Sequence, residues 1–224
     1  MGTDKIKELL ELSHNLKPFV VGAEGNISQR IGEDILIKAS GTSLRNLSSA
    51  DLILCNSKGD QINNFSKKPS LEASFHRWIL KFSNINFVAH THPTHTLKIL
   101  CTSHLREFAT KRLFPDQIVF NGARSCVVPY ATPGDELCSQ IQSAVTSYVE
   151  EEGEFPKLIL LQNHGIICAS SSSRECLVAT EICEKAAEVY WGSNCLGNPF
   201  YIEGEELTQV CEDENEKYRT QVMR

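Results

Sequence analysis

The segment LILLQNHGIICAS, residues 158–170, restricts the fold more than any other part of the chain. It contains two apolar runs of strand length, 158–164 and 165–170, with a turn predicted at His164 and Gly165. Strands joined by so short a connection pair antiparallel, because parallel neighbours need a crossover of about a dozen residues or more. The segment therefore predicts a hairpin in a sheet that is at least partly antiparallel, and it disfavours a fully parallel nucleotide-binding fold.

Other apolar runs predict strands, and amphipathic runs predict helices between them. The expected strands cover 34–40, 51–57, 86–92 and 125–131, and the expected helices cover 4–16, 70–82, 134–152 and 173–192. Asp4 and Ser70 are the expected N-caps, and Gly192 is expected to end the last helix. This interleaving, with no repeat and no long linker, predicts one α/β domain over 1–224 with an acidic helical tail at 203–224.

Charge and cysteine usage limit the partners and the compartment. The chain has 22 basic and 28 acidic side chains, a net charge of −6, which disfavours a nucleic-acid partner. No apolar run approaches the roughly 20 residues of a membrane span, and charges interrupt the opening segment where a signal peptide is apolar. The nine cysteines include no CxxC pair and read as reduced, mostly buried thiols. We therefore expect a cytoplasmic protein with no membrane partner.

Three of the seven histidines crowd into NFVAHTHPTHTLKIL, residues 86–100. In a strand, His90 and His92 point to the same face, and Pro93 ends the strand. A zinc site usually takes three protein ligands, so the pair alone does not define one. His164, at the end of another apolar run, is a candidate third ligand, whereas His95 is expected on a first helical turn in a supporting role. His14, His76 and His104 are expected to be surface or packing residues.

Glu72, in KPSLEASFHRWIL, has two interpretations. It is either an ordinary acid in the first turn of a helix, where the helix dipole favours it, or a carboxylate that transfers a proton beside a bound phosphate. The glycine-containing turns GAEGNISQR (22–30) and KASGTSL (38–44) are likewise either simple turns or backbone cradles for a phosphate. Neither turn matches the motifs for ATP or NAD.

Taken in order, GNIS, KASGT, PSLE, HTH and QNHG resemble the class II aldolase/adducin family, over about residues 5–192. The resemblance implies a three-layer α/β/α fold with a central, mainly antiparallel sheet. It implies that His90, His92 and His164 bind a divalent metal, Zn²⁺ or another divalent ion, and that Glu72 is the catalytic acid/base and can also bind the metal. It further implies homotetramers with active sites between subunits, and a substrate phosphate held along Gly25, Asn26, Ser40, Gly41, Ser70 and Leu71.

The activity that this resemblance implies is that of a lyase. A zinc-dependent aldolase of this family cleaves a ketose 1-phosphate reversibly into dihydroxyacetone phosphate and an aldehyde, and the metal stabilises the carbanion left when the C3–C4 bond breaks. A sugar-phosphate 4-epimerase or a decarboxylase using the same metal site is the enzymatic alternative. An adducin-like interaction module is the non-enzymatic one, and the complete set of three histidines and Glu72 disfavours it.

Two positions depart from the fuculose-type pattern. Leu71 stands where those enzymes have a second serine, so a side-chain donor to the phosphate is missing. Leu113 or Phe114 stands where they have the tyrosine that exchanges a proton with the aldehyde half. Candidate replacements are Tyr130, or for an epimerase Asp116 and Tyr218.

Overall fold

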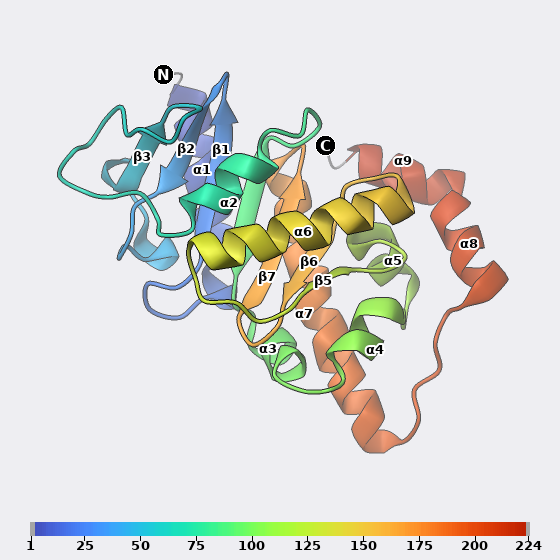
Figure 1. The fold of residues 1–224 in the computed structure, drawn as a ribbon. Coiled ribbons are helices and arrows are strands. Elements are labelled where there is room, and N and C mark those ends of the chain that lie inside the picture. The colour runs from blue at the N-terminus through green and yellow to red at the C-terminus, as the bar shows by residue number, and fades with distance from the viewer. Residues whose placement is uncertain (1–2, 223–224) are drawn as a thin grey trace.

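A seven-stranded sheet forms the middle of the protein, in a computed structural model that describes residues 3–222 (Figure 1). Its strands lie in the order β3-β2-β1-β4-β7-β6-β5. They are β1 Asn26–Ile31, β2 Asp34–Lys38, β3 Leu52–Cys55, β4 Phe87–Thr91, β5 Cys126–Val128, β6 Leu158–Leu161 and β7 Gly165–Ser170. Neighbouring strands are antiparallel except β5 and β6, which are parallel. The expected mainly antiparallel sheet is confirmed.

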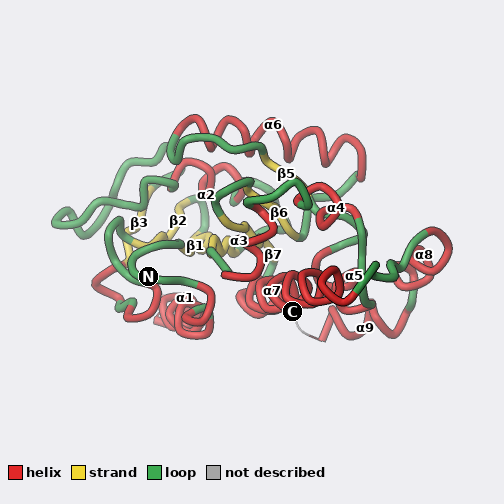
Figure 2. Tube along the Cα trace, turned by 90° about the horizontal axis from the view of Figure 1, so that it is seen from below, coloured by secondary structure: helices red, strands yellow, loops and turns green. Residues whose placement is uncertain are grey.

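Helices cover both faces of this sheet. They are α1 Thr3–Asn15, α2 Ala73–Ile79, α3 Thr94–Leu100, α4 Leu105–Thr110, α5 Pro115–Asn121, α6 Asp135–Glu152, α7 Ser173–Leu196, α8 Gly204–Glu212 and α9 Glu214–Val222. Helices α2 and α6 lie over one face, and α1 and α7 lie over the other (Figure 2). The three-layer α/β/α arrangement is therefore confirmed. None of the helices described combines the length and apolar character of a membrane span.

Each face of the sheet has its own hydrophobic core, because side chains alternate along a strand. In β4, Ala89 packs into the core under α1 and α7, whereas Val88 packs into the core under α2 and α6. His90 shares the parity of Val88, so its side chain points to the α2 side. All nine cysteines are free and six are buried, which agrees with the expected reduced thiols.

The β6–β7 hairpin is confirmed, but its turn lies earlier than predicted. β6 ends at Leu161, and Leu161 pairs with Gly165 across a loop of three residues. Asn163 takes the left-handed conformation, with φ 55°, and the His164 N–H donates to the Leu161 carbonyl. His164 is therefore a turn residue, not the last residue of a strand.

Strand β1 was not predicted, because the sequence GAEGNISQR reads as a turn. Asn26, Ser28 and Gln29 are polar yet buried, and Ile27 alone supplies an apolar side chain in this buried stretch. A half-buried strand is recognised in a sequence by alternating apolar and polar residues, and polar residues on the buried face remove that alternation. The short helices α3, α4 and α5 also went unassigned, apart from the helical turn expected after Pro93.

Several helix boundaries differ from the prediction. Helix α2 begins at Ala73 and ends at Ile79, with Glu72 and not Ser70 as its N-cap residue, because Ser70 opens a turn closed by the Ala73 N–H on the Ser70 carbonyl. Asp4 lies inside the first turn of α1. Helix α7 continues through Gly192 and ends at Leu196, before Gly197. A glycine inside a helix costs only about 1 kcal/mol, which the buried face of α7 outweighs.

The acidic segment 203–224 was expected to be a helical tail. Over the residues described it forms two helices, α8 and α9, separated by Asp213 and with no buried residue in either. They contact α5 on the side of the molecule away from β3 (Figure 1).

Candidate metal centre

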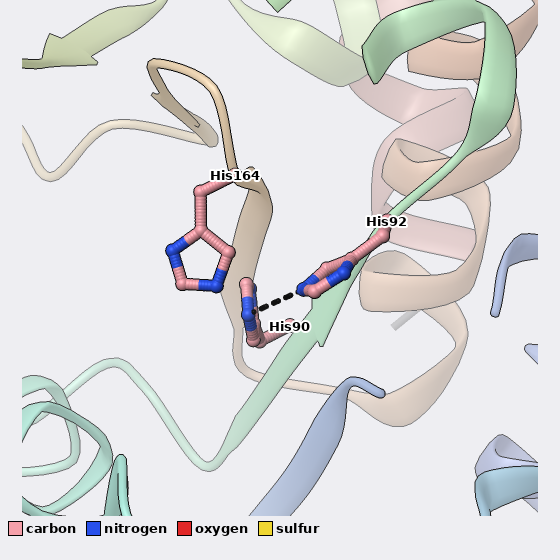
Figure 3. A group of neighbouring side chains, drawn as sticks. All are labelled: His90, His92 and His164. Carbon is pink, nitrogen blue, oxygen red and sulfur yellow. Dashed lines mark hydrogen bonds between the residues drawn. The ribbon is translucent and has the colours of Figure 1, made fainter. Parts of the chain in front are cut away.

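Three histidines from two segments of the chain lie close together (Figure 3). His90 is in β4, His92 follows that strand, and His164 comes from the β6–β7 turn. Antiparallel pairing of β4 with β7 brings these segments together. One nitrogen from each ring lies within 4.8 Å of the others, and the facing Nε2 atoms of His90 and His92 are 3.0 Å apart. The expected grouping of these three side chains is confirmed.

The outer nitrogens of two rings face acceptors, which leaves the inner nitrogens free to bind. The His90 Nδ1–H donates to the Ile166 carbonyl at 2.8 Å, so its Nε2 carries the lone pair. His92 Nδ1 lies 3.3 Å from Glu24 Oε2, and a carboxylate on this side favours the hydrogen on Nδ1 and the lone pair on Nε2. Sequence reasoning missed Glu24, because nothing in GAEGNIS separates it from an ordinary turn acid.

The three imidazoles are held in the neutral form. Burial lowers the pKa of His90 to about 3 and that of His92 to about 4. Burial also lowers the pKa of His164. Metal binding requires neutral imidazole, so this cluster needs no proton release to become a ligand set at neutral pH.

Glu72 completes the cluster with a buried carboxylate. Its Oε2 accepts a hydrogen bond from Asn26 Nδ2 at 2.6 Å and lies 3.4 Å from His90 Nε2. Its Oε1 is 3.5 Å from His164 Nε2 and, although buried, has no hydrogen-bond partner. A buried, unpartnered carboxylate oxygen beside neutral nitrogens is costly unless a cation satisfies it. This donor set of nitrogen and oxygen fits a divalent metal ion.

Two glycines allow the strands to close around this cluster. A Cβ on Gly25, which has φ +71°, would lie 2.8 Å from the His90 carbonyl oxygen. A Cβ on Gly165 would lie 2.5 Å from the Thr91 carbonyl oxygen and 2.6 Å from the His92 ring. Close approach of backbones therefore requires glycine at both positions.

The residues expected along a phosphate come from three segments of the chain. An antiparallel bridge between Ala39 and Pro69 pairs two of these segments, so that Ser40 lies opposite Lys68 and Ser70 lies opposite Lys38. Two N–H groups there are already used, because Ser40 donates to the Lys68 carbonyl and Ser70 donates to the Lys38 carbonyl. Gly41 and Leu71 are exposed, and 78% of Leu71 is accessible. Gly25 and Asn26 lie nearer the histidines, and the Asn26 side chain contacts Glu72.

A buried lysine, missed in the sequence, lies at the same turn. Lys38 is 2% exposed, and its Nζ donates to the Thr42 carbonyl at 2.5 Å. Burial lowers its pKa to about 8, while the negative charge of Glu72 acts to raise it. Lys38 is thus mainly protonated at neutral pH and gives this edge of the site a positive charge.

The remaining histidines divide into two groups. His95 lies on the first turn of α3, outside the cluster, with its ring centroid 6.5 Å from that of Trp191. His14 and His104 are exposed, as expected. His76 is not an ordinary packing residue, because it is fully buried and both of its ring nitrogens contact polar side chains.

The candidates for a second acid/base occupy other parts of the chain. Tyr130 is 60% exposed, and its N–H donates to Gln162 in the β6–β7 turn. Asp116, on α5, forms an ion pair with Arg219 of α9 at 3.0 Å. Tyr218 is exposed on α9, and Leu113 and Phe114 are partly buried against the core under α7.

This chain is similar to known proteins over most of its length. The family described as Class II Aldolase and Adducin N-terminal domain matches residues 8–191. An L-fuculose phosphate aldolase of Methanococcus maripaludis strain C7 is 28% identical over 181 residues, 80% of this chain and 91% of the relative. A 5-methylthioribulose-1-phosphate/5-deoxyribulose-1-phosphate aldolase of Rhodospirillum rubrum is 27% identical over 193 residues, 85% of this chain and 81% of that relative.

The relatives are not all aldolases. A 3-oxo-tetronate 4-phosphate decarboxylase of Pectobacterium atrosepticum is 25% identical over 173 residues, 76% of this chain and 75% of the relative. Among solved structures, an L-fuculose 1-phosphate aldolase superposes with a TM-score of 0.79 at 19% identity and covers 98% of both chains, which shows a shared fold. From the match over residues 8–191 we conclude that the chain belongs to the class II aldolase and adducin N-terminal domain family.

Proposed function

We propose that this protein is a zinc-dependent lyase that cleaves a ketose 1-phosphate reversibly into dihydroxyacetone phosphate and an aldehyde. The observation that carries the proposal is the unpartnered Glu72 Oε1 beside three neutral imidazoles. The similarity to two curated sugar-phosphate aldolases supports the same reaction class.

In this proposal the chain's own residues hold the metal and move the proton. His90, His92 and His164 would hold a divalent ion, and Glu72 would bind it when no substrate is present. The bound ion supplies Lewis-acid stabilisation of the negative charge that develops as the C3–C4 bond breaks. Glu72 returns a proton to C3 during cleavage and accepts it from C3 of dihydroxyacetone phosphate during condensation. Because Asn26 occupies Oε2, Oε1 is the oxygen available for this transfer.

The phosphate is proposed to lie along Gly25, Asn26, Ser40, Gly41, Ser70 and Leu71. Leu71 has no hydroxyl and offers only its backbone N–H to the phosphate. The positive charge of Lys38 would compensate for the missing serine hydroxyl. The Asn26 amide has two N–H bonds and donates one to Glu72, which leaves the second for a ligand.

A second reaction on the same metal site is decarboxylation or 4-epimerisation of a sugar phosphate. The decarboxylase among the relatives supports this alternative. It also fits the absence of a tyrosine at 113 and 114, where the fuculose-type aldolases carry one.

Purified, metal-replete protein tests these reactions with a panel of ketose 1-phosphates and a coupled assay for dihydroxyacetone phosphate. Product analysis by NMR separates the alternatives, because an epimer retains every carbon and a decarboxylase releases carbon dioxide. Glu72→Gln is the matched variant, which should keep its fold and lose the activity. A protein that retains no metal, and whose stability ignores added zinc, would instead be a binding module.

We further propose that the chain is one domain and assembles as a homotetramer with active sites between subunits. A neighbouring subunit would then supply the second acid/base, for which Tyr130, Asp116 and Tyr218 are the candidates. The free thiols support a cytoplasmic location.

A further inference from the structure

A buried histidine behind the metal centre connects to Glu72 through two polar side chains. His76, on α2, has 0% exposure and stacks on Phe75 at a ring-centroid distance of 4.6 Å. Its Nδ1 lies 2.7 Å from Ser28 Oγ, and its Nε2 contacts Asn26 Oδ1. Ser28 and Asn26 are on β1, with exposures of 0% and 3%. These side chains form a continuous polar path through an otherwise apolar layer.

The carboxylate at one end fixes the direction of every hydrogen bond in this path. The Asn26 amide N–H donates to Glu72 Oε2, so the Asn26 carbonyl oxygen faces His76. His76 must then carry its hydrogen on Nε2 and accept at Nδ1, and the Ser28 hydroxyl donates to it. Burial lowers the pKa of His76 well below its ordinary value, which keeps the ring neutral as this pattern requires.

We propose that His76 is a positioning residue, which holds the Asn26 amide in one orientation and so leaves Glu72 Oε1 free for proton transfer. A reversed amide would point its oxygen at the Glu72 carboxylate and its N–H at the His76 N–H, and both contacts are repulsive. The inference rests on the proposed function, because it assigns His76 a part in placing the proposed acid/base. Asn26 also links this path to the proposed phosphate site, since its second N–H is free for a ligand.

Three variants and one control separate positioning from packing. His76→Leu removes both hydrogen bonds, His76→Gln retains one donor and one acceptor, and Ser28→Ala removes the hydroxyl that donates to His76 Nδ1. Ser13→Ala is the control, because Ser13 is also buried, at 1% exposure, and its hydroxyl donates to the Leu44 carbonyl at 2.6 Å on the other face of the sheet.

The readouts are kcat and KM for cleavage, exchange of the C3 proton of dihydroxyacetone phosphate with solvent deuterium, and the His76 tautomer by ¹⁵N NMR. We expect the Nε2–H tautomer in the wild type, and a loss of about 10- to 100-fold in kcat and in proton exchange for His76→Leu. His76→Gln should recover most of that loss, and Ser28→Ala should show a smaller one. Ser13→Ala should lose stability but not proton exchange.

The Nδ1–H tautomer in wild-type protein would overturn the inference, as would folded His76→Leu protein with unchanged proton exchange. If His76→Leu does not fold, Ser28→Ala and the wild-type tautomer decide the matter. The ¹⁵N NMR measurement of the His76 tautomer does not depend on enzyme activity. Wild-type protein that shows the Nε2–H form but neither proton exchange nor cleavage would therefore refute the proposed function, while the hydrogen-bond path itself would still be supported. In that case the positioning role fails together with the function.

Discussion

At the scale of single residues, His90 and His92 depend on different supports. A backbone carbonyl of β7 holds His90, whereas the side chain of Glu24 faces His92. A backbone acceptor is present whatever the sequence, but a carboxylate can be removed by mutation. Glu24 is therefore the support through which the metal affinity of the cluster can be changed without touching a ligand.

Glu24→Gln should weaken zinc binding by about 10- to 100-fold, because the amide is a poorer acceptor for the His92 Nδ1–H. Competition with a chelator of known affinity measures the change. Glu33→Gln is the control, since Glu33 is an exposed acid in the turn between β1 and β2. Equal zinc affinity in both variants would show that Glu24 does not act on His92.

The sequence predicts the ligand set because strand alternation pairs His90 with His92, and because the family motifs point to His164 and Glu72. It does not predict a role at the site for Glu24, Lys38 or His76. The importance of these three comes from contacts between segments, such as β1 with α2, that no local pattern encodes. Buried polar residues also look like surface residues in a sequence, which is why His76 was expected to be an ordinary one.

At the scale of elements, helix α3 begins soon after β4, the strand that carries His90, and a side chain from another helix caps it. Pro93 is its N-cap residue and makes no side-chain cap bond. Glu184, on α7, instead accepts from the His95 N–H at 2.8 Å and from the Thr96 N–H and hydroxyl, each at 2.9 Å. The strand end that carries His92 is thus connected to the long helix behind the sheet.

Glu184→Ala should lower the free energy of unfolding by about 1–3 kcal/mol, because it leaves several partly buried donors unpaired. Urea denaturation measures this. Glu188→Ala, an exposed residue on the same helix, should stay within about 0.5 kcal/mol of wild type. Equal midpoints for the two variants would contradict the capping role.

An ion pair stabilises the loop between β3 and α2, and its contribution to the stability of the protein depends on pH. Asp51 accepts from Lys67 Nζ at 2.5 Å and from the Ser48 hydroxyl at 2.7 Å, and these bonds lower its pKa from 3.8 to about 2. A carboxyl whose pKa is lower in the folded state stabilises the protein above pH 3.8 and loses that contribution as the pH falls toward 2.

Lys67→Met should therefore raise the pKa of Asp51 toward 3.8 and reduce stability at neutral pH. The stability difference from wild type should shrink as the pH falls below that value. A carboxyl ¹³C titration of Asp51 reads the pKa directly. An unchanged Asp51 pKa in the variant would show that Lys67 does not lower it.

Elements with alternating or apolar sequences were predicted well, and those with buried polar faces were not. The β6–β7 hairpin and α6 follow from periodicity, whereas β1 was hidden because its buried face carries Asn26 and Ser28. Helix α2 came out too long, since Ser70 resembles a cap but opens a turn instead, in a segment that pairs with the end of β2 through the bond from the Ser70 N–H to the Lys38 carbonyl. Such long-range pairing lies outside what a local pattern can show.

At the scale of the whole molecule, one chain leaves large apolar side chains in solvent. The exposed fractions are 78% for Leu71, 93% for Leu196 and 96% for Phe200. Apolar surface of this kind suits an assembly in which other subunits cover it. Native mass spectrometry should find four chains of 25.0 kDa in one particle, whereas a monomer at every concentration would contradict the proposed tetramer.

The central claim is that His90, His92, His164 and Glu72 form a metal-dependent site for cleaving a sugar phosphate. Release of dihydroxyacetone phosphate from a panel of ketose 1-phosphates, measured beside the zinc content of the same samples, tests it most directly. Wild-type protein and His95→Ala should retain zinc and release the product, and His92→Ala should do neither. Fully zinc-loaded wild-type protein that releases no dihydroxyacetone phosphate from any substrate would contradict the account, as would full zinc occupancy in His92→Ala.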